Sequence, residues 1–224
     1  VLPPHSLSPN LKSNGDLFQL RSTLRGRSGR WEAAERDATA ALELDPRNST
    51  RYLLPAVFLA RNHKVREYEA LCRQILSTFP EPEDVYAADR LAKACLLLPA
   101  PGVDVDAAGR LADRVVMRPG GDEFSTPFFQ LCKALGDYRR GRFQDAMVWS
   151  RRVLGSPHAN AHAQAWAVLA LAQFRVGETA DARVSLDEAE RLAPGTMPKE
   201  VAEDTDDSWL RWLMARLSID EARR

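Results

Sequence analysis

One short sequence motif recurs along this chain in variant forms. In each form a glycine is soon followed by alanine in a helix-forming context. It begins at Gly29 as Gly-Arg-Trp-Glu-Ala-Ala, at Gly141 as Gly-Arg-Phe-Gln-Asp-Ala and at Gly177 as Gly-Glu-Thr-Ala-Asp-Ala. Pro46 and Pro80 lie one repeat length apart and each is expected to end a helix. A pattern that returns about every 34 residues predicts stacked helix-turn-helix units, none of which buries its own apolar face.

We therefore expect an all-α protein whose repeats occupy residues 16–194. Their approximate bounds are 16–48, 49–82, 83–125, 126–158 and 159–194. The Pro-, Ser- and Asn-rich residues 1–15 are expected to be a linker or N-terminal extension of a piece cut from a longer polypeptide.

The chain is expected to end in an acidic loop and an amphipathic helix. The loop covers 195–206, and the helix over 207–224 has Trp209, Leu213 and Leu217 among its apolar residues. Because a solenoid must cover the exposed end of its last repeat, we interpret this helix as a cap.

The middle of the chain departs from the repeat. A predicted helix is broken at Pro99-Ala-Pro-Gly, and Asp104 or Asp106 is expected to cap the helix that follows. Thr126 and Pro127 predict the next helix start, with threonine as the cap and proline in the first turn.

Composition excludes several classes of function. Basic and acidic residues balance at 31 each, which gives no general attraction to nucleic acid or to an anionic membrane. No apolar run approaches the length of a membrane span. The three cysteines, Cys72, Cys95 and Cys132, are odd in number and lie far apart, which favours a reducing, cytoplasmic location over a disulfide framework.

The spacing of large, small and turn residues resembles the tetratricopeptide repeat (TPR) family over roughly 16–194. The last unit fits the pattern best, at Trp166, Leu169, Ala170, Phe174, Ala182, Leu186, Ala189 and Pro194. This resemblance implies a right-handed superhelical solenoid of about five helix pairs plus a C-terminal capping helix.

A narrower resemblance lies in phrases such as Tyr68-Glu-Ala-Leu-Cys-Arg-Gln-Ile-Leu and Ala134-Leu-Gly-Asp-Tyr-Arg-Arg-Gly-Arg-Phe. They look like the C-terminal TPR regions of large bacterial proteins with a serine/threonine kinase or WD40-repeat domain upstream. The likeness implies an accessory array behind another module. It implies no kinase activity, because no nucleotide-binding or catalytic-loop motif is present.

The TPR resemblance also implies a concave groove lined by the first helix of each unit. Carried over by position, the groove consists of Gln19, Thr23, Arg27, Leu53, Val57, Arg61, Leu91, Leu131, Leu135, Tyr138, Arg139, Leu171 and Arg175. Its middle is apolar, and arginines recur at one slot in four units. An extended peptide with apolar anchors and acidic residues would match, because guanidinium groups pair bidentately with carboxylates. Alternatively, the arginines complement helix dipoles, and a neighbouring domain covers the apolar slots.

Other candidate sites have a simpler explanation. His158 and His162 have the spacing of two metal ligands on a helix, but no third ligand is evident, so we expect no metal. The aromatics of the repeat slots are expected to be core residues rather than a platform for bases: Trp31, Phe143, Trp149, Trp166 and Phe174. We expect no catalytic site and no cofactor.

The sequence therefore predicts a non-catalytic protein–protein interaction module, a scaffold whose concave groove binds a peptide or a neighbouring domain. The expected partner is a protein or peptide, with an upstream domain of the same polypeptide as one option, and neither nucleic acid nor membrane. The alternative is a regulatory or spacer segment of a bacterial signalling enzyme, such as a serine/threonine kinase, that has no separate partner.

Overall fold

A computed structural model describes residues 14–82, 84–117, 122–157, 161–197 and 207–224. Within these ranges every regular element is helical. The helices form five pairs and a final helix: α1 (Asn14–Arg27) with α2 (Trp31–Leu44), α3 (Leu53–Arg61) with α4 (Val65–Thr78), α5 (Val85–Leu96) with α6 (Val105–Met117), α7 (Thr126–Arg139) with α8 (Phe143–Leu154), α9 (His162–Arg175) with α10 (Thr179–Leu192), and α12 (Ser208–Ala222). A short 3-10 turn, Ser49–Arg51, precedes α3.

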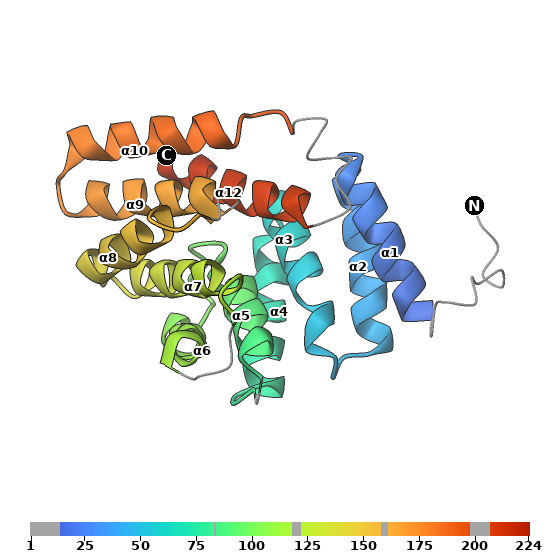
Figure 1. Cartoon of the computed structure of the whole chain (residues 1–224). Helices are drawn as coiled ribbons and strands as arrows, with labels where there is room; N and C mark the ends of the chain where they lie inside the picture. Colours follow the sequence, from blue (N-terminus) through green and yellow to red (C-terminus); the bar gives the residue numbers. More distant parts are fainter. Residues whose placement is uncertain (1–13, 83, 118–121, 158–160, 198–206) are drawn as a thin grey trace.

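The pairs stack side by side into a curved array, which confirms the predicted solenoid (Figure 1). The second helix of each pair packs on the first helix of the next pair. First helices also pack on one another, α3 on α5, α5 on α7 and α7 on α9, whereas second helices make no comparable contacts among the described residues. The first helices therefore form the inner, concave side of the curve.

The turn inside a pair depends on one residue with positive φ. Gly29, Gly141 and Gly177 have φ angles of 71°, 75° and 87°, and each lies in a three-residue turn between the helices of its pair. In the second pair the same place is taken by His63, at φ 58°. The recurring glycine is therefore explained by backbone conformation, since only glycine adopts this region without steric cost.

Small residues let the helices approach closely. Ala34, Ala38 and Ala146 are fully buried where the second helix of a pair crosses its neighbours. Tyr68 takes an alanine slot in α4 and is also fully buried. Its hydroxyl accepts a hydrogen bond from the backbone N–H of Leu98 at 3.3 Å, and burial raises its pKa well above the ordinary value.

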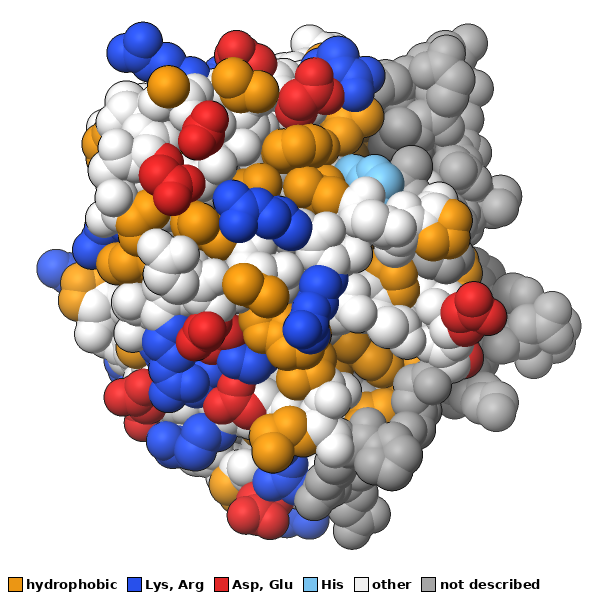
Figure 2. Space-filling view, turned by 60° about the vertical axis from the view of Figure 1, so that its left-hand side comes forward, with side chains coloured by type: hydrophobic (Ala, Val, Ile, Leu, Met, Phe, Trp, Pro, Cys, Tyr) orange, Lys and Arg blue, Asp and Glu red, His pale blue; other side chains and the backbone are white. Residues whose placement is uncertain are grey.

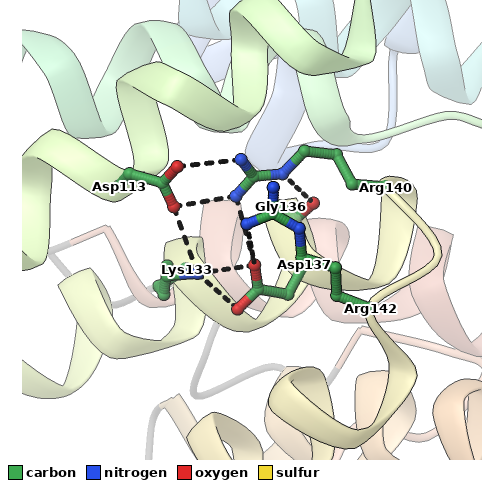
Figure 3. Close-up of polar contacts among 6 residues, drawn as sticks. All are labelled: Asp113, Lys133, Gly136, Asp137, Arg140 and Arg142. Atoms are coloured by element: carbon green, nitrogen blue, oxygen red, sulfur yellow. Dashed lines mark hydrogen bonds and ion pairs between the residues drawn. The ribbon is translucent and has the colours of Figure 1, made fainter.

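Charged side chains hold α6 against α7 where the repeat pattern is weakest. Asp113 of α6 receives two bonds of 2.8 Å from Arg140 and lies 3.1 Å from Lys133 Nζ. Lys133 and Arg140 also bind Asp137, whose side chain is fully buried (Figure 3). Burial by itself would raise the pKa of Asp113, but the hydrogen bonds from Arg140 and Lys133 outweigh it and lower the pKa.

Local predictions around α6 and α7 have mixed outcomes. Asp104 caps α6, since its carboxylate accepts from the N–H of Ala107 at 2.8 Å. Pro127 lies in the first turn of α7 as expected. The prediction that Thr126 caps α7 is wrong: the hydroxyl of Thr126 donates to the carbonyl of Asp122, and the Asp122 carboxylate accepts from the N–H of Ser125.

One predicted core aromatic is also misplaced. Trp31, Phe143, Trp149 and Trp166 are partly buried against the core, but Phe174 is 65% exposed. Its equivalent in the fourth pair, Tyr138, is buried. The fifth pair packs on the fourth, whereas among the described residues no further pair packs on the fifth, and the side of α9 that carries Phe174 is exposed.

We predict that His63→Gly stabilises the protein by about 0.5 kcal/mol. Relief of the left-handed conformation, worth about 1 kcal/mol, exceeds the added backbone entropy of the unfolded chain. Urea unfolding followed by circular dichroism measures the change. In the converse control, Gly177→Ala should lose about 1 kcal/mol, since a Cβ there meets no atom within 4 Å and only the backbone is strained. A loss of stability in His63→Gly would contradict this account of the turn.

We predict that Asp113→Asn loses about 2 kcal/mol at pH 7 and much less at pH 3. The folded-state pKa of Asp113 lies below its unfolded value, so the unfolded chain binds more protons between the two. The stabilisation is thus present above about pH 4 and is lost as the pH falls through the folded pKa. Urea midpoints at both pH values test this, with Asp187→Asn on the exposed face of α10 as control. An equal loss at both pH values would attribute the effect to packing.

Candidate functional site: the concave face and helix α12

Helix α12 lies on the concave side of the array rather than continuing the stack. It packs along α9, contacts α10 and reaches across to α3, so that it connects the last pair with the first two (Figure 1). Most of its residues are buried: Trp209, Leu210, Leu213, Met214, Ala215, Arg216, Leu217, Ser218 and Ile219. The helix therefore covers the last pair, as a cap does, and also crosses the inner side of the array to α3.

The beginning of α12 inserts an aromatic ring between α1 and α3. Trp209 is 1% exposed and stacks on Phe58, with ring centroids 6.2 Å apart. A Cβ added to Gly26 of α1 would lie only 2.8 Å from the Trp209 ring and 2.9 Å from Phe58. The absence of a side chain at Gly26 thus creates the space that the indole occupies.

The end of α12 is held by an arginine. Arg139 of α7 binds both carboxylate oxygens of Glu221, with an Nη2–Oε2 distance of 2.6 Å. The same guanidinium donates to the carbonyl of Leu96 at 2.8 Å and to that of Leu97 at 3.0 Å. Since its side chain is only 3% exposed, this bidentate pair is largely shielded from water. Arg139 thereby joins the C-terminus of α5, α7 and α12.

A second side of α12 faces the last pair. Ala215 and Ile219 form a small apolar cluster with Ala167 of α9 and Ala189 of α10. Hydrogen bonds support it: Gln164 donates to Ser218 at 3.3 Å, Arg216 to the carbonyl of Ala193 at 3.0 Å, and Arg223 to Glu190 at 2.6 Å. Contact on two sides explains why α12 is apolar around most of its circumference.

The structure brings most of the predicted groove residues into contact with this same core. Val57, Leu91, Leu131, Leu135, Tyr138 and Leu171 are buried in one hydrophobic cluster with five residues of α12, and Leu53 packs against it. Gln19 and Thr23 of α1 are partly buried. The apolar middle of the predicted groove is thus buried in the same core that holds the apolar residues of α12.

The four recurrent arginines have different surroundings. Arg61 lies over the ring of Trp31 at 5.8 Å, and Arg175 over the ring of Phe143 at 4.6 Å, so each contacts the preceding pair. Arg139 binds Glu221 as described above. Arg27 is partly buried at the end of α1. Of these arginines, Arg139 is the one for which an ion pair with α12 is observed among the described residues.

A small cavity remains beside the end of α12. Its volume is about 150 Å³, and Ala60, Arg61, Leu98, Leu217 and Glu221 are among its lining residues. Burial raises the pKa of Tyr138, and the negative charge of the Glu221 carboxylate raises it further.

The surface over α8, α9 and α10 shows no single kind of side chain. Hydrophobic side chains are scattered there among basic and acidic ones (Figure 2).

The remaining candidate residues form no reactive site. Cys72, Cys95 and Cys132 are buried free thiols. A hydrogen bond with Cys72 and burial raise the pKa of Cys95, and burial raises that of Cys132. His162 contacts the carbonyl of Ser156, while His158 lies outside the described residues. Across the described ranges, no three His, Cys, Asp or Glu side chains gather as metal ligands, and no helix has the length and apolarity to span a bilayer.

Sequence reasoning missed the residues that seat α12, namely Gly26, Phe58 and Glu221. A signal was present in the spacing of Trp209, Leu213, Leu217 and Glu221, which lie four residues apart on one stripe. Ala215 and Ile219 lie on a second stripe. Two stripes on one helix indicate two contact surfaces, although they do not identify them.

No protein-family model matches the chain, and no curated protein matches it in sequence. The crystal structure of PilW, a widely conserved type IV pilus biogenesis factor, aligns with a TM-score of 0.56 and 16% identity over 84% of this chain and 81% of PilW. The fold is that of a TPR-like helical solenoid.

Two MamA structures, AMB-1 and MSR-1, align with TM-scores of 0.46 and 0.45 at 16% and 15% identity. Each alignment covers 80% of this chain, and 99% and 95% of the respective MamA chains. These scores are too low to add to the argument. At 16% identity the likeness to PilW shows a shared fold alone.

We predict that Gly26→Ala destabilises the protein by about 2 kcal/mol, because the new methyl group overpacks the Trp209 site. Urea unfolding measures the loss, and tryptophan fluorescence reports any movement of the indole. Gly155→Ala is the matched control, since its Cβ would lie 3.5 Å or more from the nearest atom and its φ is −78°. Equal stability of Gly26→Ala and wild type would mean that α12 is not seated on α1.

Proposed function

We propose that this chain is a non-catalytic protein–protein interaction module, a scaffold whose concave face binds a segment of a partner protein or of a neighbouring domain. The observation that carries the proposal is the way this face holds α12. An apolar floor covers one stripe of the helix, an aromatic pocket holds Trp209, and Arg139 pairs with Glu221. These are the elements by which helix-in-groove recognition achieves affinity and direction.

The predicted groove residues support the proposal in part. Leu131, Leu135 and Leu171 contribute to the floor, and Arg139 supplies the bidentate contact to a carboxylate. The proposed ligand differs from the extended peptide expected from the sequence, because the segment seated on this face is a helix. Arg61 and Arg175 instead contact aromatic rings of the preceding pair.

A non-catalytic role agrees with the state of the reactive side chains. The three thiols are buried, two of them with raised pKa values, so they are poor nucleophiles. Asp89, a buried carboxyl with a pKa raised by desolvation, is paired with Lys93 of the same helix. The shift at Asp89 follows from its burial and is opposed by the ion pair within α5.

One observation favours the second candidate, a regulatory or spacer segment without a separate partner. Because the apolar groove residues are buried in the same core as α12, the concave face offers little uncovered apolar surface while the helix stays in place. In this second candidate, a kinase or WD40-repeat domain lies upstream of the repeats. The support for such a domain is the sequence resemblance alone.

Position-specific photo-crosslinking in the cells that express the full chain separates the two. The crosslinker is placed at Thr23 and Arg61, which lie on the concave side, and at Arg73 and Arg183, which are exposed on α4 and α10. An interaction module should give protein adducts from the concave positions and none from the others. Adducts from the exposed positions only, or from none of the four, would refute concave binding and favour the spacer role.

A further inference from the structure

We infer that α12 is an internal ligand, and that the partner of the concave face is an amphipathic helix with the same contact stripe. This inference rests on the proposed function and specifies its ligand. The required chemistry is an aromatic residue, two leucine-like residues and a carboxylate at successive intervals of four residues. In α12 these are Trp209, Leu213, Leu217 and Glu221.

The two ends of the stripe select for the spacing between an aromatic ring and a carboxylate on the bound helix. Gly26 and Phe58 make a site for a flat ring, and Arg139 makes a site for a carboxylate. Twelve residues of helix separate the two groups, about 18 Å along the axis. A segment with only one of these groups, or with a different spacing, satisfies one end and leaves the other unfilled.

Side-chain contacts join α12 to the repeats at both of its ends. Trp209 stacks on Phe58 of α3, and Glu221 pairs with Arg139 of α7. Fifteen residues separate α10 from α12 along the chain.

The fit of α12 is also incomplete. Among the described residues, the buried indole N–H groups of Trp209 and Trp212 have no hydrogen-bond acceptor. The cavity beside Leu217 and Glu221 leaves part of the contact unfilled. Unpaired buried donors and unfilled space both weaken binding relative to a fully matched helix. A partner helix can therefore compete with α12 for its place.

The test uses a fluorescent peptide with the sequence of residues 207–224 and the full-length chain. In Glu221→Lys a positive charge faces Arg139, which should free the face and tighten peptide binding by at least about tenfold relative to wild type. Asp220→Lys is the matched control. It makes the same charge change one residue away, where Asp220 pairs with Arg216 of its own helix, and should bind the peptide as wild type does.

Changes in the peptide test whether both ends of the stripe are needed for binding. Replacing its tryptophan at position 209 by alanine, or its glutamate at position 221 by lysine, should weaken binding to the Glu221→Lys chain at least tenfold. The lysine peptide should recover binding to a chain that carries Arg139→Glu alone, in which Glu221 of α12 faces a negative charge and the lysine of the peptide faces an opposite one. Absence of peptide binding to every folded variant, or equal binding regardless of these changes, would overturn the inference.

Hydrogen exchange on the wild-type chain provides a measurement without mutation. Saturating peptide should accelerate exchange in 208–222 and leave α5 and α7 protected. Unchanged exchange at saturating peptide would show that α12 is not displaced, which also overturns the inference. Because the crosslinking experiment records any partner of the concave face, adducts there without peptide binding would reject only this ligand and leave the interaction role intact.

Discussion

The guanidinium of Arg139 connects three helices that are far apart in the sequence. It belongs to α7, binds the last carbonyls of α5 and pairs with Glu221 of α12. Because this charge is nearly inaccessible to water, leaving it without a carboxylate partner would be costly. The position of α12 follows from this pair at one end and from the Trp209 site at the other, and the coverage of the concave face follows from the position of α12.

The repeats themselves were predictable because their signals are local. Gly29, Gly141 and Gly177 mark turns that need positive φ, and Pro46 and Pro80 follow the ends of second helices. Asp104 marks a helix start by the same kind of short-range bond. His63 shows the limit of this reasoning, since its turn has the same conformation without the residue that signals it. Only the repeat itself places a turn there.

The occupant of the concave face was not predictable, because nothing local specifies it. The apolar residues of α12 identify a buried helix. A helix that caps α10 and a helix that crosses the inner face both require such apolar residues, so the sequence does not distinguish them. The sequence shows that the arginines occupy equivalent positions of the repeats, but it does not distinguish their partners. Arg61 and Arg175 contact aromatic rings, whereas Arg139 binds a carboxylate. Phe174 was misassigned for a related reason: the same slot is buried in the fourth pair, at Tyr138, and exposed in the fifth, and its residue type does not distinguish the two.

The bridge that α12 makes between the first and last pairs changes how such an array is expected to unfold. Each unit of a simple solenoid touches only its neighbours, so the ends fray independently and the contact order stays low. Here Trp209 touches Gly26 and Phe58, more than 150 residues earlier in the chain. This long-range closure adds contacts between distant parts of the sequence, from α1 and α3 to α12, at the expense of slower folding.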